Sequence, residues 1–223
     1  MAQKEGFPTE KYPGFFSSAF VAVMFAAHTN LAGTLAWSLA HIADDAKYQD
    51  KSRAECEAAL DGTGMTCILN CAQVNFFTIL GNRDFNLGSL QKLPFSDCIM
   101  KEVVRNYGVL FITRGVITPI EFGGTMVPPG EIIAVSPYLT HHDPNVYEDP
   151  DSFKPERFNG NAISKHIENK TYTQFGYGTH RCMGERFANI VMKVAWMELL
   201  TKYRVELLTP ITPPDFSRYV LKS

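Results

Sequence analysis

The sequence predicts a mainly α-helical protein with small β-sheets. Most of its 223 residues fall into long apolar or amphipathic runs that are bounded by helix-starting prolines and helix-ending glycines. Strand-like runs are short, and most of them lie within residues 109–136 between glycines and prolines. A hydrophobic content of 45% at this length is typical of a soluble globular protein with a substantial core.

The first predicted element is one long helix over about residues 15–45, because residues 12–43 contain no charged side chain. Such a helix is roughly 45 Å long at about 1.5 Å per residue, which is enough to cross a membrane. His28, Thr29 and Asn30 fall at its centre, where hydrocarbon tolerates polar groups least. We therefore expect a helix buried through the middle of a large protein, with a membrane span as the alternative.

The remaining segments alternate helices with loop-rich stretches. Pro94 starts a helix over about residues 94–107, and Gly108 ends it. Loop-forming residues dominate after Pro137. The other predicted elements are a charged amphipathic helix over 44–60, an apolar helix over about 67–80, strands within 109–117 and 132–136, a final helix over about 184–203, and a strand after it.

Charge and cysteine content exclude several classes of protein. The formal net charge of -2 and the absence of a basic stripe indicate that nucleic acid is not a partner. Five cysteines are an odd number in a chain too long to need disulfides, which favours a reducing compartment. Cys67 and Cys71 are expected to be ordinary buried thiols, because no second Cys/His pair matches their spacing. We expect no signal peptide, because residues 1–14 lack an apolar segment.

One cysteine, Cys182, stands among glycines immediately before the final predicted helix. Free N–H groups and the positive end of a helix dipole stabilise a thiolate at such a position. Gly178 permits a tight left-handed turn, and Gly184 leaves room for a flat group against the backbone. Phe175 can cover the sulfur from water, and His180 with Arg181 can face an anionic ligand group. The pattern favours a buried thiolate bound to a cofactor over a cysteine nucleophile, for which no suitable base is evident.

The stretch FGYGTHRCMGERFA resembles the haem-binding loop of the cytochrome P-450 superfamily, whose pattern is F-x-x-G-x-x-x-C-x-G. Phe175, Gly178, Cys182 and Gly184 match it. The resemblance implies that Cys182 is the metal ligand, an axial thiolate on the iron of haem b that favours O–O cleavage. It also implies that His180 faces a haem propionate and that electrons come from NADPH through a reductase. Arg114 matches a position where the family often reaches a propionate.

A second match lies upstream in the same order. Glu102 and Arg105 in KEVVR can pair at i, i+3 on a helix and, taken alone, would be read as a surface salt bridge. Here they resemble the family's E-x-x-R helix, and Arg157 in KPERF resembles the arginine that completes its triad. Such a buried network would brace the floor beneath the cysteine loop. Gly108 stands where the family usually has a proline.

A third match lies in the charge-free helix, where the family carries an acid–alcohol pair beside the oxygen site. His28 and Thr29 occupy this place, and His followed by Thr resembles the sterol 14α-demethylases. Thr29 would deliver protons and His28 would supply them. Asn30 could instead occupy the threonine position, as in relatives that act as isomerases or dehydratases on oxygenated lipids.

The resemblance runs from about Phe15 to the end, roughly half the length of a family member. We therefore expect the carboxyl-terminal half of the cytochrome P-450 fold, with the amino-terminal half absent and apolar faces of the long helix uncovered. The predicted function is a haem-thiolate monooxygenase for an apolar substrate such as a sterol or lipid, with a flavoprotein reductase or a ferredoxin as redox partner. An inactive fragment, or a haem-thiolate isomerase or dehydratase, is the alternative. The expected location is the cytosolic face of the endoplasmic reticulum membrane if the intact protein has an anchor, and the cytoplasm otherwise.

Other polar residues receive a structural interpretation. His141 and His142 are predicted to be turn residues. Lys193 and Arg186 are predicted to belong to a solvated helix face, in preference to a patch that binds a redox partner.

Overall fold

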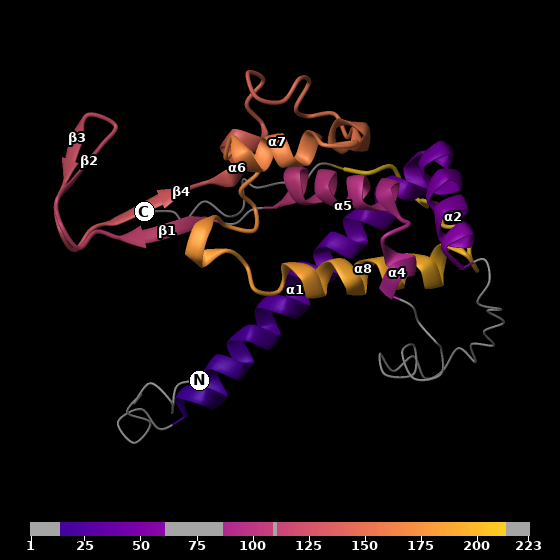
Figure 1. Cartoon of the computed structure of the whole chain (residues 1–223), viewed down its shortest axis with the longest axis horizontal. Helices are drawn as coiled ribbons and strands as arrows, with labels where there is room; N and C mark the ends of the chain where they lie inside the picture. Colours follow the sequence, from indigo (N-terminus) through magenta and orange to yellow (C-terminus); the bar gives the residue numbers. More distant parts are fainter. Residues whose placement is uncertain (1–13, 61–86, 109–110, 213–223) are drawn as a thin grey trace.

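The computed structural model describes residues 14–60, 87–108 and 111–212. Helices make up most of this part of the chain, and two small antiparallel sheets accompany them (Figure 1). This arrangement confirms the predicted fold class. The helix predicted over residues 67–80, with Cys67 and Cys71, lies outside the described residues.

Four helices form the body of the molecule. Figure 1 shows α8 crossing α1, with α5 beside them and α2 at one end. The short helix α4 lies against α2 and α8. The bounds of these four helices and of α4 are Phe15–Asp44 for α1, Ala46–Leu60 for α2, Leu87–Leu90 for α4, Pro94–Tyr107 for α5 and Glu185–Leu200 for α8.

The main core lies where α1, α5 and α8 meet. Ile42, Ile99 and Trp196 are fully buried there. The Trp196 indole N–H donates a hydrogen bond of 3.1 Å to the Ser38 hydroxyl, so the one polar atom of the indole ring is satisfied inside the core. Apolar residues recur on one face of α5, which explains why this helix buries that face against two others.

Side chains from α2 stabilise the start of α5 and the end of α8. The Glu55 carboxylate accepts hydrogen bonds from the backbone N–H groups of Phe95 (2.7 Å) and Ser96 (3.0 Å), which lie in the first turn of α5 and have no partner within that helix. At the carboxyl end of α8, the Arg53 guanidinium donates to the carbonyls of Leu200 and Tyr203. These contacts fix where α5 begins and α8 ends.

The strands lie apart from the helical body, as the extended arm at the left of Figure 1. The first sheet pairs β1 with β4, and Arg114 lies opposite Ile133 in its register. The second pairs β2 with β3 through a turn at Gly123 and Gly124, both of which have positive φ. The bounds are Ile112–Gly115 for β1, Ile120–Phe122 for β2, Thr125–Val127 for β3 and Ile132–Val135 for β4.

The long segment between β4 and α8 packs over α5. Its core contains Tyr147, Phe158 and Tyr172, which enclose Cys98 and Val104 of α5. Phe158 lies in one of the short helices of this segment, whereas Tyr147 and Tyr172 lie in the loops between them. The short helices are α6 over Pro137–His141, the 3-10 helix η2 over Pro155–Phe158, α7 over Ala162–Glu168 and the 3-10 helix η3 over Gly178–His180.

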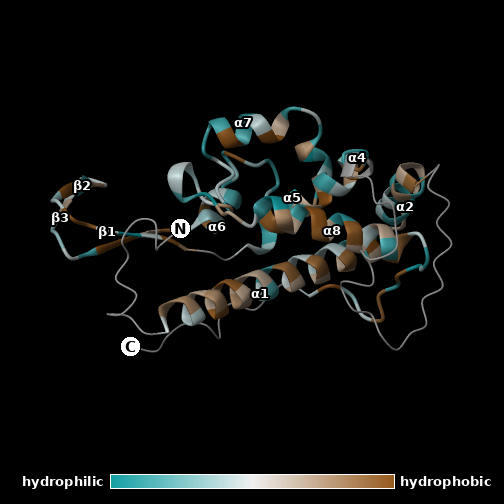
Figure 2. Ribbon diagram, turned by 60° about the horizontal axis from the view of Figure 1, so that its bottom comes forward, coloured by the Kyte–Doolittle hydropathy of each residue, from teal (hydrophilic) through white to brown (hydrophobic). Residues whose placement is uncertain are grey.

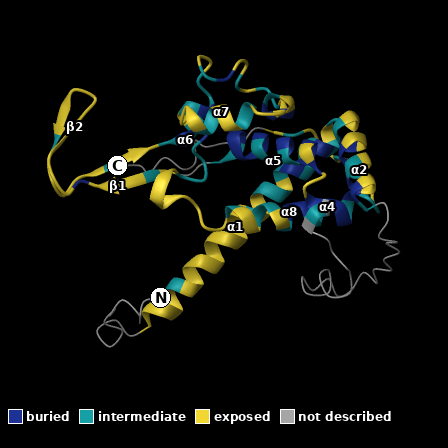
Figure 3. Ribbon diagram, in the orientation of Figure 1, coloured by how far each residue is buried: buried dark blue, intermediate teal, exposed yellow. Residues whose placement is uncertain are grey.

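The predicted burial of the long helix is found at one end only. Ser38 and Ile42 are the buried residues of α1, whereas its first half is coloured apolar in Figure 2 and exposed in Figure 3. Phe20 is 67% exposed and Phe25 is 71% exposed. The physical reason is that α5 and α8 contact α1 toward its carboxyl end, and within the described residues none of the helices covers the rest.

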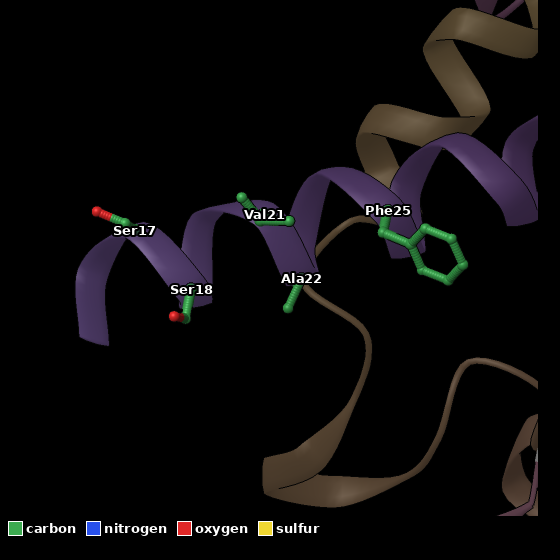
Figure 4. Close-up of a pocket in the computed structure, with 5 residues that line it drawn as sticks. All are labelled: Ser17, Ser18, Val21, Ala22 and Phe25. Carbon is green, nitrogen blue, oxygen red and sulfur yellow. The ribbon is translucent and has the colours of Figure 1, made fainter. Parts of the chain in front are cut away.

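The exposed half of α1 has two further properties. By length and composition α1 could cross a membrane, although a core helix meets the same criteria. An open hollow lies along its surface, lined by Ser17, Ser18, Val21, Ala22 and Phe25 (Figure 4). None of these five residues belongs to the predicted site.

The strand predicted after the final helix is not formed within the described residues, which extend to 212. Instead, the Gln49 side chain takes the place of a strand partner. Its amide donates to the Val205 carbonyl and accepts from the Val205 N–H, both at 2.8 Å. One buried amide therefore satisfies the backbone groups that a neighbouring strand would have satisfied.

Candidate functional site

Glu102 and Arg105 on α5 form a fully buried ion pair. The Arg105 Nε–Glu102 Oε2 distance is 2.8 Å, and a second bond of 2.9 Å joins Arg105 Nη2 to Glu102 Oε1. This two-point geometry fixes the guanidinium in one plane with the carboxylate. Both side chains have no exposed surface. Taken alone, the i, i+3 spacing indicates a surface pair, and only the segment packed over α5 makes this one buried.

Arg157, in η2 of the segment that covers α5, joins the same carboxylate. Its Nε lies 3.1 Å from Glu102 Oε1. Its remaining N–H groups donate to the carbonyls of Glu148 (2.8 Å), Asp149 (3.1 Å) and Ser152 (3.2 Å). The guanidinium therefore holds the loop that precedes it in a fixed shape.

Arg105 also holds this covering segment in two more places. Its Nη1 donates to the His141 carbonyl at 2.6 Å and its Nη2 to the Pro150 carbonyl at 2.8 Å. The Lys154 N–H donates to Glu102 at 2.9 Å. The Glu102 carboxylate is shared by both guanidiniums, and their other N–H groups donate to carbonyls, so the network fixes the geometry of residues 141–157 over α5.

The cysteine loop, residues 175–184, is the last part of the segment between β4 and α8. The Cys182 N–H donates a 2.7 Å hydrogen bond to the Phe175 carbonyl, which closes the loop. The Phe175 ring packs against the cluster that contains Tyr147 and Phe158, so it anchors the loop from below. This position differs from the expected cover over the sulfur.

Two glycines give the loop its shape. Gly178 has φ 65° and lies in the left-handed region that its place in the sequence predicts. Gly176 has φ 76°, and a Cβ atom there would lie 2.9 Å from the His180 carbonyl oxygen. Sequence reasoning missed Gly176, although the repeated glycines in FGYG were a signal for it.

The sulfur of Cys182 lies at the amino end of α8 and is exposed, whereas the sequence predicted a buried thiolate. The chain itself supplies no cover over it in the described residues. A Cβ atom added at Gly184 would meet only the Cys182 Sγ, at 3.8 Å, and so would occupy open space beside the sulfur. An accessible sulfur at a helix start, with open space next to it, fits an axial ligand of haem.

The two buried cysteines differ from Cys182 in their chemistry. Burial raises the pKa of Cys56 to about 12, and burial also raises the pKa of Cys98. Both are therefore neutral thiols at physiological pH, and both lie inside apolar clusters. A thiolate ligand is accordingly expected at Cys182 and at neither of these positions.

The basic residues of the loop and sheet are exposed. His180 lies in η3, and Arg114 lies in β1, where its guanidinium donates to the Thr113 carbonyl at 2.7 Å. Arg181 forms a two-point pair with Glu185, with distances of 2.7 and 2.8 Å. The charge of Arg181 is therefore matched within the chain and not directed at a ligand.

His28 and Thr29 lie on the exposed half of α1. Within the described residues, no hydrogen bond joins either side chain to the cysteine loop, and their place beside the oxygen site stays a prediction. The neighbouring Asn30 amide donates to the Ala26 carbonyl one turn earlier, at 2.9 Å. Asn30 is thus engaged with its own helix.

The prediction for Lys193 is wrong, and His141 is the last residue of α6, whereas His142 lies in a turn as predicted. His141 is completely buried, and burial lowers its pKa to about 4. Lys193 is 9% exposed; its ammonium lies 2.8 Å from the Asp97 carboxylate and donates to the Leu90 carbonyl at 2.8 Å. Both residues are polar, but neighbours from distant parts of the sequence cover them, which local composition does not reveal.

Gly108 makes a contact that sequence reasoning also missed. A Cβ atom at this position would lie 2.3 Å from the Gln174 side chain and 2.5 Å from the Val104 carbonyl. Gln174 directly precedes Phe175 in the cysteine loop. The residue that replaces the expected proline is therefore small because the loop approaches α5 at this point.

Comparison with known proteins adds independent findings. The family model described as cytochrome P450 matches residues 18–222. The chain is 33% identical over 145 residues to probable cytochrome P450 28d2 of Drosophila melanogaster, covering 61% of this chain and 29% of that protein. It is 32% identical over 206 residues to cytochrome P450 4A11 of Homo sapiens, covering 90% and 35%.

The sterol 14alpha-demethylase of Mycolicibacterium vanbaalenii is 26% identical over 193 residues, covering 86% of this chain and 38% of that protein. The chain thus spans about a third of the length of these curated relatives. The relatives belong to several branches, and no branch is singled out. Because the family model matches nearly the whole chain, the resemblance seen in the sequence is confirmed at the level of the family, and this chain belongs to the cytochrome P450 family.

Proposed function

We propose that this chain carries the haem-thiolate half of a monooxygenase that inserts one oxygen atom from O2 into an apolar substrate. The observation that carries the proposal is the exposed sulfur of Cys182 at the start of α8, in a loop closed by the Cys182–Phe175 hydrogen bond. Membership of the cytochrome P450 family supports a haem b cofactor at this sulfur. When bound, the haem supplies the oxygen-activating chemistry.

The residues around the loop have distinct proposed tasks. Cys182 ligates the iron, and Gly178 and Gly184 let the backbone come close to a flat group. His180 and Arg114 hold the propionates, which agrees with their exposed, positively charged or donor-bearing side chains. Glu102, Arg105 and Arg157 touch no ligand; they keep the covering segment in place on α5, below the loop.

His28 and Thr29 are proposed to handle protons on the opposite side of the cofactor. The Thr29 hydroxyl donates toward the oxygen site and His28 resupplies it. The Asn30 side chain is bonded to the Ala26 carbonyl, which favours Thr29 over Asn30 for this task. The exposed apolar surface of α1 next to these residues is consistent with an apolar substrate.

A sterol is the more specific substrate that we propose, with 14α-demethylation as the reaction. It rests on the His28–Thr29 sequence and on similarity to a sterol 14alpha-demethylase, which is one of several related branches. A flavoprotein reductase or a ferredoxin would deliver electrons from NADPH. The cytosolic face of the endoplasmic reticulum is the proposed location of an anchored form, and the cytoplasm that of a form without an anchor.

The first test is reconstitution of the 223-residue chain with haem, followed by the spectrum of its reduced carbon monoxide complex. We expect the strongly red-shifted Soret band that thiolate ligation gives. Cys182→Ala should lose this band. Cys56→Ala is the matched control, because its thiol is buried and its raised pKa keeps it neutral; it should retain the band.

The alternatives give different results. If the chain retains no haem, the interpretation as an inactive fragment is favoured. If Cys182→Ala keeps the red-shifted band, another side chain ligates the iron and the proposal fails. In a version of the protein that includes the rest of the family domain, oxidation of a sterol must consume reductant in proportion to product. Turnover without reductant would indicate an isomerase or dehydratase.

A further inference from the structure

An aromatic cluster joins α1 to α5 outside the proposed site. The His41 Nε2 and the Tyr107 hydroxyl oxygen are 2.6 Å apart. The Trp37 ring stacks on Tyr107 with centroids 4.0 Å apart and planes 3° apart, and His41 stacks on Phe153 at 3.7 Å and 3°. Three segments far apart in the sequence therefore fix one phenol against one imidazole.

The protonation states define which group donates. Burial lowers the pKa of His41 to about 4, although the Asp44 and Glu102 carboxylates oppose this shift. Burial also raises the pKa of Tyr107. At neutral pH the imidazole is therefore uncharged and the phenol is protonated, so the Tyr107 O–H donates to His41 Nε2. A separation of 2.6 Å is at the short end of the range for protein hydrogen bonds.

This pairing matters for one-electron chemistry. A phenol that loses an electron becomes a strong acid. Its oxidation is therefore easiest when a base already accepts a hydrogen bond from its O–H group and can take the proton. Tyr147 and Tyr172 donate to the carbonyls of Thr171 and Lys101, and a backbone carbonyl cannot keep the proton. Tyr48 donates to the Glu156 carboxylate, but over 3.3 Å.

The residue after Tyr107 contacts the residue before the cysteine loop. Tyr107 is followed by Gly108, which abuts the Gln174 side chain. Gln174 precedes Phe175, whose carbonyl accepts the Cys182 N–H. A path of covalent bonds and close contacts thus connects the phenol to the loop, and the stacked Trp37 extends the aromatic system along α1.

We propose that Tyr107 is a one-electron donor whose proton acceptor is His41. One electron passes from the Tyr107 phenol to an oxidant, which is reduced by one electron. The phenol O–H bond breaks and an N–H bond forms at His41 Nε2, leaving a neutral phenoxyl radical and an imidazolium. Only the identity of the natural oxidant, the cofactor at Cys182, rests on the proposed function. The redox property belongs to the pair itself.

The test uses the full 223-residue chain without haem, so it is independent of the proposed function. A ruthenium(III) polypyridyl complex, generated by flash-quench, is the one-electron oxidant, and electron paramagnetic resonance of frozen samples detects tyrosyl radicals. We expect a tyrosyl signal in the wild-type chain. Tyr107→Phe should lose most of it, and Tyr48→Phe, the matched control, should keep it.

His41→Phe separates the proton acceptor from the phenol, because a phenyl ring can still stack on Phe153 but cannot take the proton. It should also lose most of the signal. Circular dichroism establishes that each variant is folded, and if Tyr107→Phe does not fold, His41→Phe carries the test alone. The proposal is overturned if the wild-type chain gives no tyrosyl signal, or if Tyr107→Phe or His41→Phe retains it.

Discussion

The two halves of α1 differ in burial although both are apolar. Ile42, near the carboxyl end, is fully buried between α5 and α8, whereas Phe25 is 71% exposed. The covered half packs against α5, which also carries the buried Glu102–Arg105 pair, and we call these parts together the packed region. The first half of α1 and the cysteine loop form the exposed region (Figure 3).

The proposed site is divided between these regions. Residues that would touch a ligand, such as Cys182, His28 and Thr29, are exposed. Those that brace the segment over α5, Glu102 and Arg105, are buried with their charges matched inside the chain. Contacts within this chain therefore set the geometry beneath the cysteine loop, whereas the burial of the ligand-facing groups depends on what binds to them.

The largest difference between the regions is expected for two arginine ion pairs. Arg105→Leu leaves the Glu102 carboxylate buried beside Arg157 alone and should lower the free energy of unfolding by about 3–5 kcal/mol. The same change at Arg181, whose pair with Glu185 is partly exposed, should cost less than about 1 kcal/mol. Urea unfolding curves measure both. Equal losses would show that the packed region does not depend on its buried network.

Truncation of apolar side chains along α1 tests the comparison within one helix. Ile42→Ala should destabilise the chain by about 2–5 kcal/mol, because it opens a cavity in the main core. Val23→Ala, at a position 62% exposed, should change stability by less than about 0.5 kcal/mol. A large cost at Val23 would mean that something covers the first half of α1 in solution.

Acid should destabilise the packed region because His141 is buried there in its neutral form. The pKa of His141 is about 4 in the folded chain and about 6.5 when unfolded, so only the unfolded state binds a proton between these values. Stability is full above about pH 6.5 and falls by up to about 3 kcal/mol as the pH drops to about 4.

His141→Phe tests this contribution. Both ring nitrogens of His141 are buried without a hydrogen-bond partner among the described residues, so a phenyl ring costs no hydrogen bond. The variant should be folded at pH 7 and should lose less stability on acidification than the wild type, as measured by urea unfolding at pH 7 and pH 5. An unchanged difference between the two pH values would contradict the assignment.

The last prediction concerns the boundary between the regions. Gly108→Ala places a methyl group against the Gln174 side chain and the Val104 carbonyl and should cost about 1–3 kcal/mol. Gln174→Ala removes one of these obstacles, so the double variant should recover part of the loss. A double-mutant cycle measures the coupling. Additive losses would show that α5 and the cysteine loop are not in contact at this point.

Local patterns were sufficient for much of the fold. Pro94 and Gly108 bound α5 because one suits a first helical turn and the other follows the last. The cysteine motif could be recognised because its phenylalanine, glycines and cysteine stand at fixed spacings immediately before a predicted helix. The strand after α8 was predicted wrongly, since no local signal shows that Gln49, 156 residues before Val205, binds its backbone.

Burial of polar residues could not be predicted in this way. Lys193 and His141 looked like surface residues, and Glu102–Arg105 alone looked like a surface pair. Each is buried because segments distant in sequence pack over it, as Arg157 does over Glu102. The sequence pattern of a single helix predicts which of its faces is apolar, but it does not predict which distant segments pack against its polar residues.

By itself, the sequence determined the helical class of the protein, its family and the one cysteine placed at a helix start, because these depend on residue types at short, fixed spacings. The tertiary structure alone decided which half of α1 is covered, which polar groups are buried, and that Tyr107 meets His41. These features depend on contacts between residues tens of positions apart, and such contacts form only when whole helices pack against one another.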